Sequence, residues 1–354
     1  MELKDHLISV IIVTWNGEKL LKSHFDSICR QQKVNYEIIV VDNCSQDNTK
    51  SLIEKYSLKY PNITIKYVFS SENTGTALGS NLGIDHAEGE YIFWISNDME
   101  FDELCIKYLF EKIHNNPKCG ICTPRMNKFI NNNKTNIVDS IGGELDFLAN
   151  PMSVGINEIY EEKNFKKDKI FFSYGGALFI RTSLAKSIKG YDERYFTLGD
   201  DIDLSWRAQL KGYEILSEKK ALLYHRVSAT LSHSTDRAKR RYLSERNNFC
   251  SILKNYSLST LIVILPIYLL IIILEMIFYL IKFRPKLTYS ILKALKWNFI
   301  NLKETLNKRT FIQKNRKKND FDIIRNMKLF PIKIYYFYDY IKNFNKERWK
   351  YFFN

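Results

Sequence analysis

The sequence of 354 residues is 45% hydrophobic and 26% charged, which excludes an intrinsically disordered, collagen-like or disulfide-scaffold protein. Its net charge of +14 lies at the C-terminal end, because the residues from Lys282 onward include 19 Lys and Arg against 5 Asp and Glu. Residues 1–281 are therefore neutral overall, and we expect the basic segment, not the body, to seek an anionic surface.

The six cysteines do not form a disulfide framework in a chain of this length, and a reducing cytoplasm is the simpler expectation. Cys119 and Cys122 form one CxxC pair. A zinc ribbon needs a second pair at matching spacing, and a thioredoxin-type motif needs a different strand–helix context. We therefore expect neither zinc nor redox chemistry at this pair.

Short apolar runs alternate with segments of helical periodicity from the N-terminus, which predicts a mostly parallel sheet covered by helices. The predicted strands are Ile8–Thr14, Glu37–Val41, Ile63–Val68 and Tyr91–Ile95. The predicted helices between them are Glu18–Gln31, Thr49–Tyr60 and Thr76–His86.

Each of these strands is followed by a polar cluster. The clusters are Thr14–Gly17, Asp42–Ser45, Asn73–Gly75 and Ser96–Asp98. Such residues are also ordinary turn formers. Four clusters at the carboxyl ends of successive strands nevertheless favour a ligand site, because open α/β sheets bind ligands at that edge.

The pattern is looser in the second half of the chain. We expect a helix over Cys105–Asn115 and then a long Asn/Lys-rich connection through Asn131–Lys134. Further on we expect a helix that begins in the acidic run at Asp200, since acids favour the first turn, and two strands, one containing Tyr213–Leu216 and one ending at Ala221–His225.

Seven segments in this order carry a resemblance to a known family: SVIIVTWNG, IIVVDNCSQDNT, ENTGTALGSNLGI, GEYIFWISNDME, SYGGALFIR, GYDERYFTLGDDIDLSWRAQLKGY and ALLYHRVSAT. The stretch from Ile8 to about Asn248 resembles family 2 glycosyltransferases of the GT-A fold, and most of all rhamnosyltransferase-like members of cell-surface glycan pathways. The resemblance implies an α/β catalytic domain over residues 1–256, with a nucleotide-sugar donor half at 1–100 and an acceptor half at 101–256. Residues 257–354 would then form a hydrophobic helix and a basic, aromatic-rich, membrane-associated tail.

The resemblance also implies the reaction. A hexose or deoxyhexose would pass, with inversion, from a UDP- or dTDP-sugar to a hydroxyl of a surface-glycan or lipid-linked saccharide acceptor. In the donor site, Asp42 matches the residue that accepts the N3–H of uracil or thymine, and Thr14, Asn16 and Asn73 are expected to line the base and ribose pocket. An Asx turn or a cap of the following helix is the structural alternative for Asp42.

A divalent cation is expected on the leaving diphosphate. Asp98 matches the last acid of the family's D-x-D motif, but the motif here reads Ser96-Asn97-Asp98, so the first acid is missing. The resemblance suggests His225 as a second protein ligand, with diphosphate and water completing the shell. Imidazole would favour Mn²⁺ over Mg²⁺, although a histidine after an apolar strand is often structural.

Asp201 matches the catalytic base, which would take the proton of the acceptor hydroxyl. Neighbouring acids raise a carboxyl pKa and so make a better base, whereas helix capping explains Asp200. The predicted acceptor and sugar site comprises Gly175, Gly176, Asp200, Trp206 and Arg207. The glycines would let the backbone approach the substrates. Trp206 is suited to stacking on a sugar face or to the core.

Leu261–Ile281 is long enough to span a bilayer and contains one charge, Glu275. A single crossing would separate a cytoplasmic catalytic body from a tail whose charge also prefers the cytoplasmic side. We therefore expect a re-entrant or interfacial helix pair with Leu287–Ile300, bent at Pro266, on the cytoplasmic face of the membrane. A buried helix of a soluble protein is the alternative.

Basic and aromatic side chains are mixed in Ile332–Phe344 and Trp349–Phe353, which suits an anionic membrane surface; next to the hydrophobic run we expect no nucleic-acid partner. We expect a group of basic residues before that run to bind a phosphate, either of a lipid-linked acceptor or of lipid headgroups. The alternative is that these residues form a solvated helix face. The group is Arg237, Lys239, Arg240, Arg241 and Arg246. The rival functions for the whole chain are a nucleotidyltransferase of related architecture and a non-catalytic, basic-tailed membrane-binding module.

Overall fold

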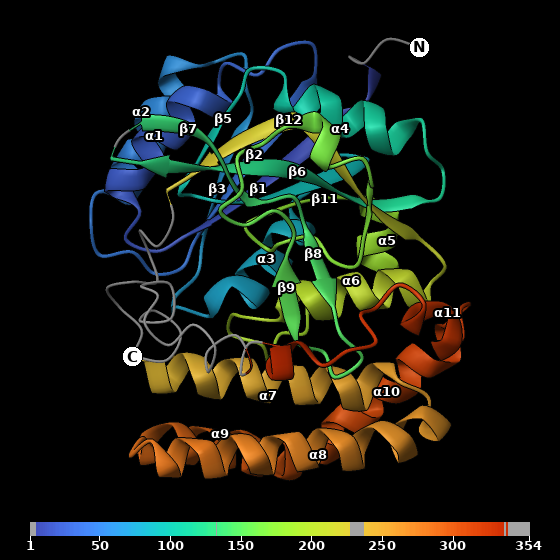
Figure 1. Cartoon of the computed structure of the whole chain (residues 1–354). Coiled ribbons are helices and arrows are strands. Elements are labelled where there is room, and N and C mark those ends of the chain that lie inside the picture. The colour runs from blue at the N-terminus through green and yellow to red at the C-terminus, as the bar shows by residue number, and fades with distance from the viewer. Residues whose placement is uncertain (1–4, 132, 227–236, 336–337, 339–354) are drawn as a thin grey trace.

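The computed structural model describes residues 5–131, 133–226, 237–335 and 338. Within them, ten strands form one sheet, in the order β10-β12-β6-β11-β4-β1-β2-β3, with β5 beside β12 and β7 beside β6 (Figure 1). The first half contains β1 (Leu7–Thr14), α1 (Glu18–Ile28), β2 (Asn35–Asp42), α2 (Thr49–Lys59), β3 (Ile65–Phe69), α3 (Gly75–Asp85) and β4 (Tyr91–Ser96). All four predicted strands and three predicted helices of this half are thereby confirmed.

The central strands are apolar on both faces, because helices cover both sides of the sheet. Along β1, Val10 and Ile12 pack with α1 and α2, whereas Ile11 points to the opposite face and packs with α3. Strands β4, β1, β2 and β3 run parallel, so their carboxyl ends lie along one edge of the sheet.

The second half contains β5 (Met99–Phe101), α4 (Cys105–His114), β6 (Cys119–Ile130), β7 (Asn133–Ser140), β8 (Gly143–Leu145), β9 (Pro151–Ser153), β10 (Lys169–Ile170), β11 (Ala177–Arg181), α5 (Thr182–Ser187), α6 (Asp200–Leu210) and β12 (Glu214–His225). The expected Asn/Lys-rich connection is wrong, since it is a β-hairpin whose arms are β6 and β7. The two expected strands after α6 are one strand, β12, with a register shift between Glu218 and Leu222. Composition alone does not reveal this long strand, because its regular structure depends on pairing with β6.

Helices α7 (Arg237–Asn255), α8 (Leu258–Ile281), α9 (Pro285–Ile300), α10 (Leu302–Asn315) and α11 (Asp320–Ile324) follow. In Figure 1, α7 lies against the α/β body, and α8 and α9 form a layer beneath it. The predicted domain boundary at residue 256 falls in the turn between α7 and α8. Helix α8 continues through Pro266, so the expected change of direction occurs instead at the turn before α9.

After α11 the chain returns to the body. The N–H of Lys328 donates to the carbonyl of Leu145, and the N–H of Ile332 donates to Asp146 Oδ2 at 2.7 Å. Of the predicted aromatic–basic stretches, Trp349–Phe353 and much of Ile332–Phe344 lie outside the described residues.

Candidate active site

The carboxyl ends of β1, β2 and β4 bring three predicted donor residues to one edge of the sheet: Thr14, Asp42 and Asp98. This convergence follows from the parallel register, in which Thr14 is opposite Asp42 and Val13 is opposite Ser96. The clusters that follow different strands in the sequence therefore belong to one site.

The carboxylate of Asp42 is buried and held at both oxygens. The N–H of Ser45 donates to Oδ1, and the hydroxyl of Tyr67 on β3 donates to Oδ2, each at 2.9 Å. Burial and the Asp42 charge raise the pKa of Tyr67, so its hydroxyl stays protonated as the donor. Each carboxylate oxygen retains a second acceptor position, which suits Asp42 to receive a ring N–H.

The three other residues predicted for the base and ribose pocket have structural hydrogen bonds. Thr14 is buried and its Oγ1 accepts a hydrogen bond from Asn97, so it supports the loop beneath the site. Asn16, in the left-handed conformation with φ 49°, accepts from the N–H of Gln46. Asn73 accepts from the N–H of Gly75 at the start of α3. Asn16 and Asn73 are exposed, so their amide N–H groups remain the candidates for ligand contact.

Asp98 lies opposite His225, the last residue of β12. The hydroxyl of Ser96 donates to Asp98 Oδ1 at 2.6 Å, and Asp98 Oδ2 is 3.4 Å from His225 Nε2. On the other side of the ring, Nδ1 is 2.7 Å from Asp139 Oδ2. Burial opposes protonation, but the hydrogen bonds to Asp139 and Asp98 raise the pKa of His225 to about 10. Burial would raise the pKa of Asp98, but the bonds from His225 and Ser96 hold it below its usual range.

This donor set fits a divalent cation. Adjacent ligands about 2.1 Å from one octahedral ion stand about 3 Å apart, close to the separation of Oδ2 and Nε2. Since a proton and a metal compete for the same imidazole nitrogen, the carboxylates that favour the proton also favour a cation in its place. Within the described ranges no group of three or more His, Cys, Asp and Glu side chains is arranged to hold a metal, so the other ligands would be diphosphate and water oxygens.

Asp201 stands at the start of α6 and is almost fully buried. Its Oδ2 accepts the N–H of Gly175 at 2.7 Å, and its Oδ1 accepts the N–H of Ile202 at 2.8 Å. Burial and the adjacent Asp200 carboxylate raise the pKa of Asp201 to about 7. A carboxylate with this pKa is suited to accept a proton near neutral pH.

The model of the family "Glycosyl transferase family 2" matches residues 9–188, about half of the chain. The chain belongs to glycosyl transferase family 2. The expected enzyme class, a glycosyltransferase, is thereby confirmed at the level of the family.

Two curated relatives illustrate the similarity of this family 2 chain. The poly-beta-1,6-N-acetyl-D-glucosamine synthase of Staphylococcus epidermidis is 26% identical over 226 residues, 63% of this chain and 51% of the relative. The putative teichuronic acid biosynthesis glycosyltransferase TuaG of Bacillus subtilis is 29% identical over 92 residues, 26% of this chain and 36% of the relative. The match thus spans about half the length of the synthase and about a third of the length of TuaG.

Solved structures confirm the GT-A fold. GalNAc-T7 with UDP, GalNAc and Mn²⁺ superposes with a TM-score of 0.58 at 17% identity, covering 70% of this chain and 48% of that one. The mannosyltransferase PcManGT of Pyrobaculum calidifontis, in complex with GDP-Man and Mn²⁺, has a TM-score of 0.51 at 15% identity, with coverages of 87% and 86%. At these identities the likeness concerns the fold alone.

Two predicted acceptor residues of the family 2 chain are not at the site. Trp206 is fully buried and packs edge-on against Phe171 and Tyr256, so it is a core residue and not a stacking surface. Arg207 pairs with Asp203 at 2.8 Å and donates to the carbonyl of Ile188 at 2.7 Å. Along α6, residues 206 and 207 lie more than a turn beyond Asp201, where the helix packs against the body.

Gly175, Gly176 and Asp200 do lie beside Asp201. The Ser96 N–H donates to the carbonyl of Gly176 at 2.9 Å, and Asp200 Oδ2 accepts from Thr76 at 3.1 Å. A Cβ at Gly176 would lie 2.9 Å from Met99 Cε. The Gly175–Gly176 segment therefore adjoins both the loop from Ser96 to Asp98, here called the Asp98 loop, and the start of α6.

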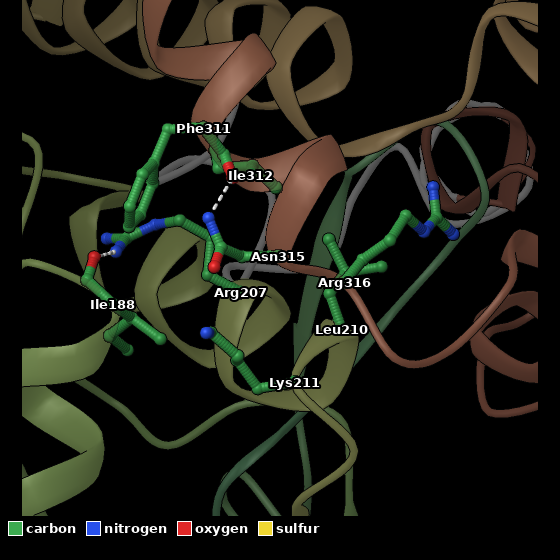
Figure 2. A pocket seen from close by; sticks show the side chains of 8 residues that line it. All are labelled: Ile188, Arg207, Leu210, Lys211, Phe311, Ile312, Asn315 and Arg316. Atoms are coloured by element: carbon green, nitrogen blue, oxygen red, sulfur yellow. Dashed lines mark hydrogen bonds between the residues drawn. The ribbon is translucent and has the colours of Figure 1, made fainter.

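A small pocket lies at the seam between α6 and α10, where Figure 2 shows the Arg207 guanidinium directed at the Ile188 carbonyl. Ile188, Arg207, Phe311 and Asn315 contribute to its lining, and neither Asp201 nor any of the predicted donor residues does. The pocket is therefore a packing gap and not the substrate site.

Only three of the five basic residues expected to bind phosphate at α7 are exposed. Arg241 is paired with Glu245 and Glu275, and Arg246 is buried with its guanidinium donating to Asn247. Arg237, Lys239 and Arg240 are exposed at the start of α7. Sequence alone did not separate these two sets, because the difference depends on which side of α7 faces the body.

Proposed function

We propose that this chain is an inverting glycosyltransferase of cell-surface polysaccharide synthesis that transfers a hexose or deoxyhexose from a nucleoside diphosphate sugar to a saccharide hydroxyl. The single observation that carries this proposal is Asp201, a buried carboxylate with a pKa of about 7, held by Gly175 next to the Asp98 loop. Family membership and the names of the polysaccharide-forming relatives support the same reaction class.

In this reaction Asp201 accepts the proton of the acceptor hydroxyl. The oxygen then bonds to the anomeric carbon, the bond from that carbon to the diphosphate breaks with its electron pair, and the nucleoside diphosphate leaves. Gly175 and Ile202 each donate an N–H to the Asp201 carboxylate, which fixes the orientation of the base. The glycine at position 175 keeps space open, since a Cβ there would lie 3.2 Å from Asp201 Cβ.

For the donor we propose a UDP- or dTDP-sugar whose base contacts Asp42. The carboxylate acceptor on Asp42 matches the N3–H that uracil and thymine share. The relatives named after N-acetylglucosamine polymers make UDP-N-acetylhexosamines candidates alongside deoxyhexose donors. One similar structure contains GDP-Man, so guanine nucleotides belong in the test.

A divalent cation, Mn²⁺ or Mg²⁺, would be held by Asp98 and His225, and when bound it would neutralise charge on the leaving diphosphate. Two of the similar structures contain Mn²⁺, which supports the proposal.

We further propose that α8 and α9 lie in the interface of the cytoplasmic face of the membrane, because nucleotide sugars are cytoplasmic. The most apolar part of α8 has a mean hydropathy of 2.9 and only 22% of it is buried. Its one carboxylate, Glu275, turns inward to Arg241 and Lys333, which leaves the outer side apolar. Exposed lysines on α9 and α10 would meet anionic headgroups: Lys286, Lys293, Lys296 and Lys303.

The experiment that tests the site is titration calorimetry of UDP, dTDP and GDP with the purified chain, with and without Mn²⁺. We expect Mn²⁺-dependent binding of UDP or dTDP that Asp42→Ala and Asp98→Ala weaken, and turnover with a sugar of the same nucleotide series. Absence of binding under all conditions would contradict the donor site. Release of pyrophosphate from an NTP would indicate a nucleotidyltransferase instead.

A further inference from the structure

Asp139 lies outside every motif of the sequence analysis. It is on β7, where Val138 pairs with Asn127 and Ser140 pairs with the preceding residue, Met126. Asp139 is therefore the extra residue of a β-bulge. Bulges redirect side chains and occur frequently beside active sites.

The redirected carboxylate reaches His225 across β6, which pairs with β7 on one side and with β12 on the other. Asp139 Oδ2 is 2.7 Å from His225 Nδ1, and the histidine and aspartate side chains are 22% and 15% exposed. An acceptor at Nδ1 favours the tautomer that carries its hydrogen there. When a cation displaces the second proton of the imidazolium, the lone pair is on Nε2, the atom that faces Asp98.

The Asp98 carboxylate is oriented in a complementary way. Ser96, at the position of the missing first acid, donates its hydroxyl to Oδ1, which leaves Oδ2 directed at His225. Two neighbours, one on β4 and one on β7, thus direct Oδ2 and Nε2 toward each other.

We propose that Asp139 is a positioning residue of the cation site: it fixes the tautomer and orientation of His225 and supplies the negative charge that Ser96 lacks. This inference rests on the proposed function, because it requires a divalent cation at Asp98 and His225. A carboxylate behind a metal-binding histidine strengthens the ligand, and loss of such a partner typically weakens metal affinity about 10- to 100-fold. It also explains how a site with a single carboxylate in contact with the cation would suffice.

The test measures Mn²⁺ binding directly. Electron paramagnetic resonance of free Mn²⁺, in the presence of UDP, gives the affinity of the wild-type chain and of Asp139→Ala, Asp139→Asn and His225→Ala. The ¹⁴N modulation of the electron spin echo reports whether a histidine nitrogen binds the ion, a signal that a purely structural role of Asp139 would not change. The matched control is Asp168→Asn. Asp168 pairs with Lys219, which lies on β12 as His225 does, so this variant also removes a carboxylate that contacts β12.

We expect Asp139→Ala to weaken Mn²⁺ binding about 10- to 100-fold and to reduce the ¹⁴N modulation, Asp139→Asn to have a smaller effect because its amide oxygen still accepts from Nδ1, and Asp168→Asn to bind as the wild type does. Wild-type affinity and modulation in both Asp139 variants, with both lost in His225→Ala, would overturn the inference and leave the cation site intact. If the wild-type chain with UDP binds no Mn²⁺, the cation assignment fails, and the inference fails with it.

Discussion

The backbone N–H of Gly175 donates a 2.7 Å hydrogen bond to Oδ2 of Asp201. Because the neighbouring Gly176 carbonyl accepts from Ser96 at the end of β4, this short segment connects the start of α6 to the sheet edge that carries Asp98. The proposed base is thus held by the same backbone that borders the proposed cation site. Movement of α6 relative to the sheet would misplace Asp201, which makes the attachment of α6 important for turnover.

Asp201→Asn should lower kcat by about 10²- to 10⁴-fold, the usual contribution of a general base, while UDP affinity stays within about twofold. Asparagine has the same shape and keeps an acceptor for Gly175. The contrasting variant is Asp203→Asn, two residues along α6, which pairs with Arg207 and Lys254 and should lower the melting temperature. Steady-state kinetics and calorimetry measure the two effects, and full turnover in Asp201→Asn would exclude it as the base.

The pH dependence should follow the Asp201 carboxyl group. Its pKa is raised to about 7 by burial and by Asp200, and only the ionised form accepts a proton, so kcat/KM should rise with pH and level off above a midpoint near 7. Asp200→Asn removes the neighbouring like charge, and the midpoint should therefore move to lower pH. A midpoint that stays constant or rises in this variant would contradict the electrostatic explanation.

Asp42→Ala should weaken UDP binding by roughly 10- to 100-fold, the equivalent of one hydrogen bond to a charged group. Tyr67→Phe removes only the hydroxyl that holds Oδ2, and a loss of roughly fivefold is expected. Calorimetric titration with UDP gives both values. Equal UDP binding by Asp42→Ala and the wild type would show that the uracil base binds elsewhere.

The outer side of α8 should determine membrane binding. Leu270 and Leu274 are 58% and 56% exposed, and replacing each with Glu should weaken binding to anionic vesicles roughly tenfold per residue, since a buried leucine contributes about 1.5–3 kcal/mol. Leu58→Glu, at an 84% exposed leucine on α2, is the control. Vesicle flotation measures the change, and unchanged partition of the α8 variants would favour a different partner for this surface.

Lys254 on α7 should be essential for stability. It is 1% exposed and lies 2.5 Å from Asp192 and 3.1 Å from Asp203. Lys254→Met leaves buried carboxylates with fewer partners, and the free energy of unfolding should fall by about 3–5 kcal/mol. Lys50→Met, which removes an exposed i,i+4 pair with Glu54, should change it by less than about 0.5 kcal/mol. Denaturant unfolding distinguishes the two, and equal small losses would contradict the role of the buried network.

Most of the N-terminal half could be predicted from the sequence, because β1, β2 and β4 contain continuous apolar runs and α1 has one apolar stripe. The hairpin of β6 and β7 could not, since Asn and Lys suit an exposed edge as well as a loop and only pairing distinguishes them. For the same reason Asp139 was missed: no local signal marks a bulge that turns one carboxylate toward another strand.

What the sequence determined by itself was the parallel α/β architecture, the polar clusters at the strand ends and the separation of a neutral body from a basic tail. Those features depend on local periodicity and composition. The tertiary structure decided which polar residues meet: it placed Tyr67 on Asp42 and Asp139 behind His225, and it put Trp206 in the core. Such contacts join residues 25 to 86 positions apart, and the chain brings them together only when the sheet has formed and its strands are in register.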